Sequence, residues 1–428
     1  MAMVLADVHG GTFSFTWPSM NPQVRDLHAV THAGEFFAEE FVQKHLIAEE
    51  CFDPSQLVPL PEAIGALASV GVAPGTKISV TTSFSKSEFA RRFPGVSFDQ
   101  QIAKAFASIQ LTEKMETARA AAANAQLPTT EAAAIHLRAG DIVYGIHREM
   151  DSFHAKVVSY PLAIEMVSRM KASGVTPVLF GQDPQLLAYL RDNHGAFCAA
   201  DLGDREGYDD VQNALFDICL LGRCSRIIAG TSGFAVLGAW LAQVTLERPD
   251  RMFDAEEAVR MIEHHVLDAP PSSDLISPHQ KAFAARAAFV LAGETIATRE
   301  PFWRLLEAAC TLDPVNPFLL FVQACSLYED GKSEEAESSL AGIIAEPSDL
   351  RKRFLVLLRN KKPGRTLPYL HALAEKARSG HVMASFCCAV SYAALGRKDA
   401  GDMLELLTAV ADEKTLRLAK QLVLTNTA

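Results

Sequence analysis

The chain has 428 residues, of which 49% are hydrophobic and 21% charged, and its formal net charge is −11. This length and composition are typical of a soluble globular protein with two or three domains. The negative charge argues against nucleic acid or an anionic membrane surface as the main partner. The sequence shows neither a secretory leader pattern nor an apolar run of about 18 residues, so we expect a cytoplasmic protein without a transmembrane segment.

The cysteines and histidines indicate no metal site. The eight cysteines form no Cys-x-x-Cys pair, and several lie within apolar helical patterns. Such usage is typical of a reduced intracellular chain with buried thiols. His264 and His265 are adjacent, so they point in different directions on a helix. We therefore expect a protein that holds no metal ion.

The first 130 residues mix short apolar runs with helical stretches. Residues 77–82 alternate between apolar and polar side chains like a strand. The pattern from Phe98 to Ala123 predicts one long helix with alanine-rich final turns, which Pro128 is expected to separate from the next domain.

Residues 131–277 are predicted to form repeated strand–helix units. Strands are expected at a run that ends at His136 and at residues 176–180, 196–199 and 226–229. Helices are expected over 161–172, from 184 onward, over 209–221 and over 234–242. Alternation of this kind predicts an α/β fold with a parallel sheet flanked by helices.

Residues 278–428 are predicted to be entirely helical and repetitive. Gly331, Gly364 and Gly396 each lie between two helical patterns, at spacings of 33 and 32 residues. Helix pairs at this period are typical of a solenoid. The stretches Leu312-Asp313-Pro314-Val315-Asn316-Pro317 and Gly331-Lys332-Ser333-Glu334-Glu335-Ala336 resemble tetratricopeptide repeats. Such arrays bind peptides, dimerise or buttress a neighbouring domain, and the sequence leaves these roles open.

Polar residues follow the predicted strands and are expected to meet at one edge of the sheet, where ligands bind in open α/β folds. The first strand runs into His136, Arg138 and Asp141, the second into Gly181, Gln182 and Asp183, and a third into Thr231, Ser232 and Gly233. The last group opens a helix, whose free N–H groups and dipole favour an anion. We therefore expect Arg138 and Ser232 to hold one diphosphate between them.

Each of these residues also has a purely structural interpretation. Arg138 and Asp141 could form an ordinary ion pair, and His136 could be a core histidine. Asp183 could cap the following helix, and residues 231–233 could be a plain helix start. Asp217 lies on an apolar helix face, where a carboxylate needs either a partner or a function.

The His-x-Arg-x-x-Asp motif of His136, Arg138 and Asp141, followed by Asp217 fourteen residues before the turn at Thr231, resembles the fucosyltransferase superfamily. The resemblance covers roughly residues 131–245. It implies an inverting, metal-independent glycosyltransferase of the GT-B type, with two Rossmann-like domains, that transfers fucose from GDP-fucose to a glycan or protein acceptor. Residues 1–130 would form the acceptor-side Rossmann-like domain, and residues 131–277 the nucleotide-sugar domain.

The resemblance also implies roles for single residues. Arg138 would bind the diphosphate and act as the catalytic residue that stabilises the leaving GDP. His136 would lie near the guanine or the β-phosphate, and Asp217 would accept hydrogen bonds from guanine. Asp141, Asp183, Thr231, Ser232 and Gly233 complete the expected donor site. Many relatives carry a second basic residue after the first Arg, where this chain has Ala139, so compensation by Arg148 or Arg223 is one possibility.

Two alternatives stay open at this point. One is a non-catalytic adaptor that acts through its helical repeats, either on a protein partner or as a homodimer. The other is a glycosyltransferase with a different nucleotide sugar. The catalytic base is not assigned, and Asp7, His9, Glu149, Asp151 and His154 are candidates by residue type alone.

Overall fold

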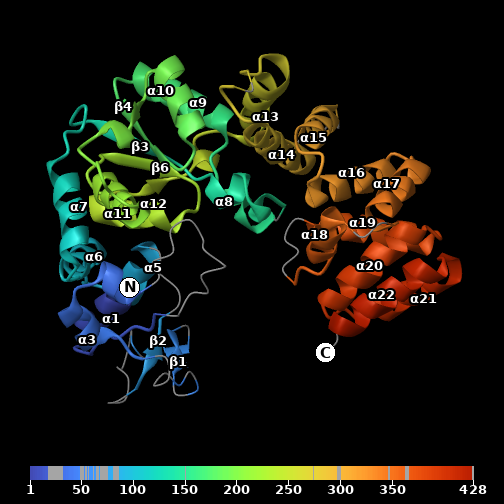
Figure 1. Cartoon of the computed structure of the whole chain (residues 1–428), viewed down its shortest axis with the longest axis horizontal. Helices are drawn as coiled ribbons and strands as arrows, with labels where there is room; N and C mark the ends of the chain where they lie inside the picture. The colour runs from blue at the N-terminus through green and yellow to red at the C-terminus, as the bar shows by residue number, and fades with distance from the viewer. Residues whose placement is uncertain are drawn as a thin grey trace.

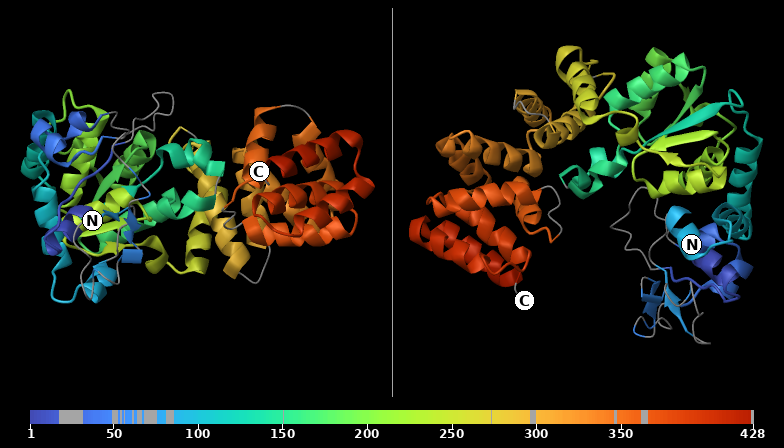
Figure 2. Two further views of the ribbon diagram at one scale, coloured as in Figure 1. Left: turned by 90° about the horizontal axis from the view of Figure 1, so that it is seen from below. Right: turned by 180° about the vertical axis from the view of Figure 1, so that it is seen from behind.

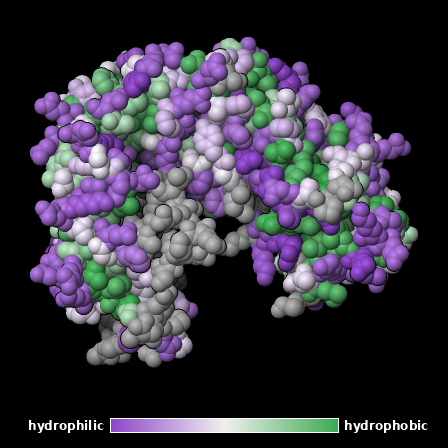
Figure 3. All heavy atoms as spheres, in the orientation of Figure 1, coloured by the Kyte–Doolittle hydropathy of each residue, from purple (hydrophilic) through white to green (hydrophobic). Residues whose placement is uncertain are grey.

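The computed structural model describes residues 1–17, 32–48, 76–80, 86–149, 151–272, 274–295, 300–345, 348–361 and 366–426, with scattered positions between 53 and 67. Its parts are arranged as an arch (Figure 1). An α/β unit forms one side and a set of helices the other, and the space-filling view is hollowed between them (Figure 3). No described helix has the length and apolar character needed to cross a membrane.

A five-stranded, fully parallel sheet forms the centre of the α/β unit. The strand order is β5-β4-β3-β6-β7. The strands are β3 (Ala132–Leu137), β4 (Thr176–Gly181), β5 (Phe197–Cys198), β6 (Arg226–Ala229) and β7 (Leu246–Glu247). The predicted parallel sheet is thus confirmed.

Helices cover both faces of this sheet, because successive residues of a strand point to opposite sides. From β3, Ala133, Ile135 and Leu137 pack against one helical layer, and Ala132 and Ala134 against the other. The first layer contains α9 (Tyr160–Ala172), α10 (Pro184–His194) and α13 (Ala255–Glu263). The second contains α7 (Glu113–Asn124), α11 (Asp210–Leu221) and α12 (Gly233–Ala242).

The N-terminal part packs below this unit in Figure 1. Its described elements are α1 (Ala2–Val8), α2 (Ala33–Phe36), α3 (Glu39–His45), β1 (Val58–Pro59), β2 (Ile78–Ser79), α5 (Lys86–Arg92) and α6 (Phe98–Ala107). β1 and β2 pair in parallel over two residues each. Of the two, β2 lies within the strand predicted at 77–82, of which Thr81 and Thr82 lie outside the described residues.

The single helix predicted from Phe98 to Ala123 is wrong, because the chain forms two helices, α6 and α7. Between them, Leu111 pairs with Phe37 in an antiparallel bridge. Thr112 then starts α7 from an extended conformation. A contact between residues so far apart along the chain cannot be seen in a local pattern.

Residues 278–426 are helical wherever the structure describes them, apart from short turns (Figure 2). The helices are α14 (Pro278–Thr295), α15 (Glu300–Leu312), α16 (Pro317–Glu329), α17 (Ser333–Ala345), α18 (Asp349–Leu358), α19 (Thr366–Arg378), α20 (Val382–Ala394), α21 (Ala400–Val410) and α22 (Glu413–Asn426). Gly331 separates α16 from α17, and Gly396 separates α20 from α21, both with positive φ; Gly364 lies outside the described residues.

The α/β unit and the first of these helices share one core. A single apolar cluster extends from β3 and α9 through α13 to α14, α15 and the start of α16. The helices from α16 to α22 enclose a second cluster. The connection after β3 lies against α14 and α16 and contains α8 (Gly140–Val143) and the 3-10 helices η3 (Ile146–Glu149) and η4 (Asp151–Lys156). The helical part therefore contacts the segment that follows Arg138.

Candidate active site

The strand order reverses between β3 and β6. Strands β4 and β5 follow β3 on one side, whereas β6 and β7 lie on its other side. At such a reversal of strand order, the loops at the carboxyl ends diverge and leave a crevice, where ligands of doubly wound sheets bind. Arg138 follows β3 and Thr231 follows β6, so the two predicted phosphate-binding segments flank this point.

A tight backbone contact fixes the turn before α12. A side chain at Gly230 would place its Cβ 2.5 Å from the carbonyl oxygens of Ala155 and Lys156. The N–H of the next residue, Thr231, donates to the carbonyl of Ala155 at 2.8 Å. The end of η4 therefore packs directly against the turn that starts α12.

The first turn of α12 offers backbone donors beside His136. Thr231 and Gly233 are exposed, and the N-cap residue Ser232 makes no capping hydrogen bond with its side chain. The His136 ring stacks on Phe234, with centroids 5.2 Å apart and an interplanar angle of 19°. His136 is only 5% exposed, and its Nδ1 is buried without a hydrogen-bond partner. This nitrogen is therefore an exception to the usual pairing of buried polar atoms.

Burial keeps the His136 imidazole neutral. Desolvation, assisted by the nearby charge of Arg138, lowers the pKa of His136 to about 4. The ring can therefore present one N–H donor and one lone pair throughout the physiological range.

Replacing His136 by Phe is expected to give a protein whose free energy of unfolding falls less than that of wild type as the pH drops from 7 to 4. In the unfolded chain His136 takes up a proton as pH falls below about 6.5, whereas the folded chain resists until about 4. Its contribution to the free energy of unfolding thus declines over this window by about 3 kcal/mol at most. Phe keeps the stacking on Phe234. Denaturation midpoints of both proteins from pH 7 to 4 test this, and parallel pH curves would contradict it.

Arg138 and Asp141 form the ion pair that the structural interpretation expects. The Arg138 guanidinium donates to Asp141 Oδ1 across the first turn of α8. The other oxygen of Asp141 lies 3.7 Å from His147 Nε2, in η3. The side chains of Arg138 and Asp141 are 28% and 31% exposed, so both remain accessible to a ligand. Pairing and anion binding are compatible, because a guanidinium has five N–H donors.

Asp183 caps α10, as its structural interpretation expects. Its Oδ1 accepts the N–H of Leu186 at 3.0 Å. Its Oδ2 accepts from the Tyr144 hydroxyl and, at 2.7 Å, from Gln280 Nε2 in α14. Burial and this carboxylate raise the pKa of Tyr144 to about 12. Both oxygens of Asp183 are thus engaged by protein donors, and the residue joins α8, α10 and α14.

Asp217 is paired within the protein. Its carboxylate lies 2.8 Å from Arg205 Nη2, in the segment after β5, and that guanidinium stacks over Phe216 at 3.9 Å. Burial raises the pKa of Asp217, and the charge of Arg205 opposes this rise. Within the described residues, no polar contact joins Asp217 to Arg138 or to residues 231–233.

The two arginines considered as replacements for a basic residue at Ala139 are engaged elsewhere. Arg148 Nε donates to Asp313 at 2.9 Å, and Arg223 donates to the carbonyls of Ala122 and Ala125 at the end of α7. Ala139 itself is only 1% exposed, within an apolar cluster. Neither arginine is therefore placed to add charge beside Arg138.

Two of the proposed bases are likewise engaged in ion pairs. Glu149 is bound by Arg353 of α18, and Asp7 pairs with Lys104 at 2.7 Å. The side chain of Asp151 lies outside what the structure describes. Sequence reasoning missed His147, which faces Asp141, and Lys156, which lies beside the turn before α12. In the sequence, only their residue types and their position within twenty residues after Arg138 could have pointed to these two residues.

A cavity of about 590 Å³ lies in the N-terminal part of the chain. Its walls come from α1, the segment after it, α3 and α6. They combine the aromatic side chains of Phe13 and Phe41 with the polar side chains of Lys44 and Gln101. This size lies in the range of small-molecule sites.

No protein-family model, curated protein or solved structure matches this chain. The resemblance to fucosyltransferases therefore depends on the motif residues and on their place in the sheet.

Proposed function

We propose that this protein is a metal-independent glycosyltransferase that transfers fucose from GDP-fucose to a hydroxyl group of a glycan or protein. The observation that carries the proposal is the place of Arg138 and the first turn of α12, which follow the two neighbouring strands at which the strand order reverses. The unpartnered Nδ1 of the buried His136 lies beside that turn. A cation, free backbone donors and a neutral imidazole together suit a diphosphate.

The chemistry follows from this arrangement. The acceptor oxygen attacks C1 of the sugar with inversion, while the bond from C1 to the β-phosphate oxygen breaks and its electron pair stays on GDP. The acceptor proton passes to a base or to solvent. Arg138 and the N–H groups at Gly233 and Phe234 would stabilise the charge that develops on the leaving diphosphate. Thr231 and Ser232 would line the same anion site.

Asp217 would recognise guanine, whose N1 and N2 hydrogens form a pair of donors suited to a carboxylate. The charge of Arg205 supports this role, because it opposes the rise in the pKa of Asp217 that burial causes. Asp183 would act indirectly, by fixing Tyr144 and the segment that contains Asp141.

The remaining parts would serve the acceptor. Residues 1–130 would complete a GT-B architecture as a second Rossmann-like, acceptor-side domain, with the 590 Å³ cavity as an acceptor subsite. Residues 278–428 would be tetratricopeptide-like repeats that position the acceptor or a protein partner.

Donor hydrolysis tests the proposed function without knowledge of the acceptor. Incubation with GDP-fucose and excess EDTA is expected to release GDP slowly, since water can replace the acceptor hydroxyl. UDP-sugars should give no release. In parallel, GDP at about one hundred times its dissociation constant should stabilise the folded protein by about 2.7 kcal/mol. If no nucleotide is hydrolysed and none stabilises the protein, the proposal is rejected. If UDP alone stabilises the protein, the donor assignment is rejected.

A further inference from the structure

Arg138 alone does not balance the negative charge of a diphosphate at the candidate site. Arg138 is paired with Asp141, so the two side chains together contribute no net charge. A nucleoside diphosphate carries at least two negative charges, which need fixed cations or donors in a site without metal. The positive end of the α12 dipole supplies only about half a charge. A second cation near Arg138 and the first turn of α12 would bring the charge of the site closer to that of the ligand.

The residue after Arg138 cannot supply it. Ala139 is buried in a small apolar cluster with Ile142, Val143 and Phe283. A longer, charged side chain at this position would have to enter that cluster, which is costly. The partly buried Phe153 of η4 packs against the same cluster.

Lys156 presents an ammonium group on the outer side of Phe153. Its Nζ lies 4.6 Å from the centroid of the Phe153 ring. In the part of the chain that the structure describes, no carboxylate pairs with this ammonium. Arg138, by contrast, has such a partner in Asp141.

Two contacts relate Lys156 to the two halves of the candidate site. Its backbone lies against Gly230, one residue before Thr231. The Phe153 ring beneath its ammonium lies 4.6 Å from the His147 ring, which faces Asp141. The backbone of Lys156 thus lies against the turn before α12, and its ammonium lies over a ring that contacts His147, the neighbour of Asp141. It is the end residue of η4, so its long side chain can turn toward a bound anion.

We propose that Lys156 is the second phosphate-binding cation of this site. Phe153 holds the ammonium in the free protein, and the ammonium moves onto the diphosphate when the nucleotide binds. A cation–π contact is weaker than a charged hydrogen bond to phosphate, so the exchange is favourable. This inference rests on the proposed function of the same site and assigns part of its specificity for diphosphates to η4.

Titration of GDP and of inorganic diphosphate into the full-length protein tests the role of Lys156. Lys156→Gln is expected to weaken the binding of both ligands roughly tenfold or more, which corresponds to about 1.4 kcal/mol or more. Lys156→Arg should keep most of the affinity. The melting temperature without ligand should stay unchanged. The difference from wild type should shrink in about 1 M NaCl, where the Debye length is about 3 Å. Lys332→Gln, at an exposed position in the helical part, is the matched control.

The outcomes separate this inference from the proposed function. If wild type binds GDP and Lys156→Gln binds it within about twofold of wild type, the assignment of Lys156 fails and the proposed function stands. If wild type binds neither GDP nor diphosphate, both fail. If Lys156→Gln is unstable, Lys156→Arg and the salt dependence of wild type decide, and loss of affinity in the Arg variant would overturn the inference.

Discussion

Replacing Arg138 by Gln is expected to weaken GDP and GDP-fucose binding by about 100-fold, or about 2.7 kcal/mol. The variant loses charged hydrogen bonds to phosphate, each of which contributes about 1.5–3 kcal/mol. It also leaves Asp141 without its cation, so a carboxylate then faces the diphosphate. Calorimetric titration measures the change directly, and donor hydrolysis should fall at least as strongly.

Two further variants make the Arg138 prediction specific. Arg138→Gln combined with Asp141→Asn should recover part of the affinity, because it removes the repulsion. Arg260→Gln, at a position of α13 that is 68% exposed, should leave binding unchanged. The stability of Arg138→Gln should stay close to that of wild type, since partly exposed ion pairs contribute little. Binding of GDP by Arg138→Gln within about threefold of wild type would contradict the proposed site.

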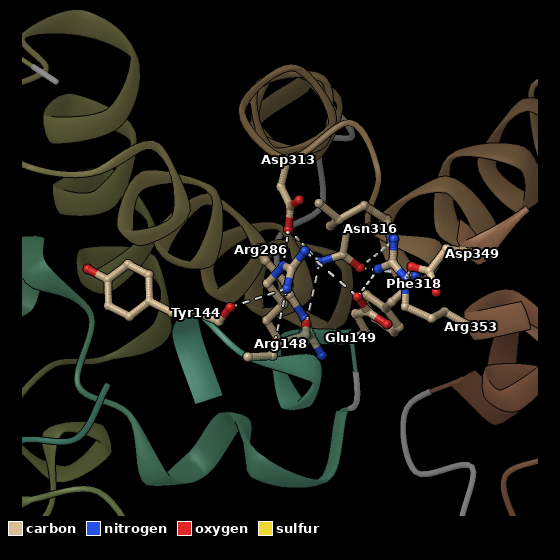
Figure 4. A network of polar contacts seen from close by, with 11 residues as sticks. Tyr144, Arg148, Glu149, Arg286, Asp313, Asn316, Phe318, Asp349 and Arg353 are labelled. Atoms are coloured by element: carbon tan, nitrogen blue, oxygen red, sulfur yellow. Dashed lines mark hydrogen bonds and ion pairs between the residues drawn. The ribbon is translucent and has the colours of Figure 1, made fainter. Parts of the chain in front are cut away.

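Replacing Arg148 by Met is expected to destabilise the folded protein by about 3–5 kcal/mol, the usual loss when one partner of a buried ion pair is removed. Figure 4 shows Arg148 at the centre of a network between η3 and the helical part. Its Nε lies 2.9 Å from Asp313, a residue that is only 3% exposed. The variant would leave this carboxylate with a single neutral partner, Asn316 Nδ2, at 2.9 Å.

Denaturant unfolding of Arg148→Met measures this loss, and Arg304→Met is the matched control. Arg304 lies 2.6 Å from Glu263 and 3.2 Å from Asp268, but its side chain is 47% exposed. Its removal should therefore cost less than about 1 kcal/mol. Adding Asp313→Leu to Arg148→Met should restore part of the stability. Equal midpoints for the Arg148 and Arg304 variants would show that the network does not stabilise the fold.

The network also connects the helical part to the candidate site. The Arg148 guanidinium donates to the carbonyl of Gly145 at 3.1 Å, and its own carbonyl accepts from Arg286 of α14. Glu149 beside it is bound by Arg353 of α18. These contacts fix η3, which contains His147 next to Asp141. Helices α14, α16 and α18 thus support the segment after Arg138.

Local patterns predicted the strands of the sheet well. Strand β3 was expected to end at His136 and ends at Leu137, and β6 has the expected bounds. Buried parallel strands are short apolar runs, and the turns after them contain glycine and polar residues. The capping role considered for Asp183 is confirmed for the same reason, because the bond from its side chain spans only three residues.

The missed features depend on contacts between distant parts of the chain. The break between α6 and α7 depends on pairing with Phe37, and Asp217 finds its partner in Arg205 from another segment. Asp313 was noticed only as part of a repeat motif, whereas the structure pairs it with Arg148. Side-chain pairing at such separations is set by tertiary packing, which residue types and local spacing do not reveal.

A crystal structure of the protein with GDP would test the central claim most directly. The account predicts that the diphosphate lies in the crevice between β3 and β6, with its oxygens in hydrogen-bond contact with Arg138 and with the backbone N–H groups at the start of α12. The His136 imidazole should line the same site. A diphosphate bound elsewhere, for example in the N-terminal cavity beside Lys44, with the crevice unchanged, would contradict the account.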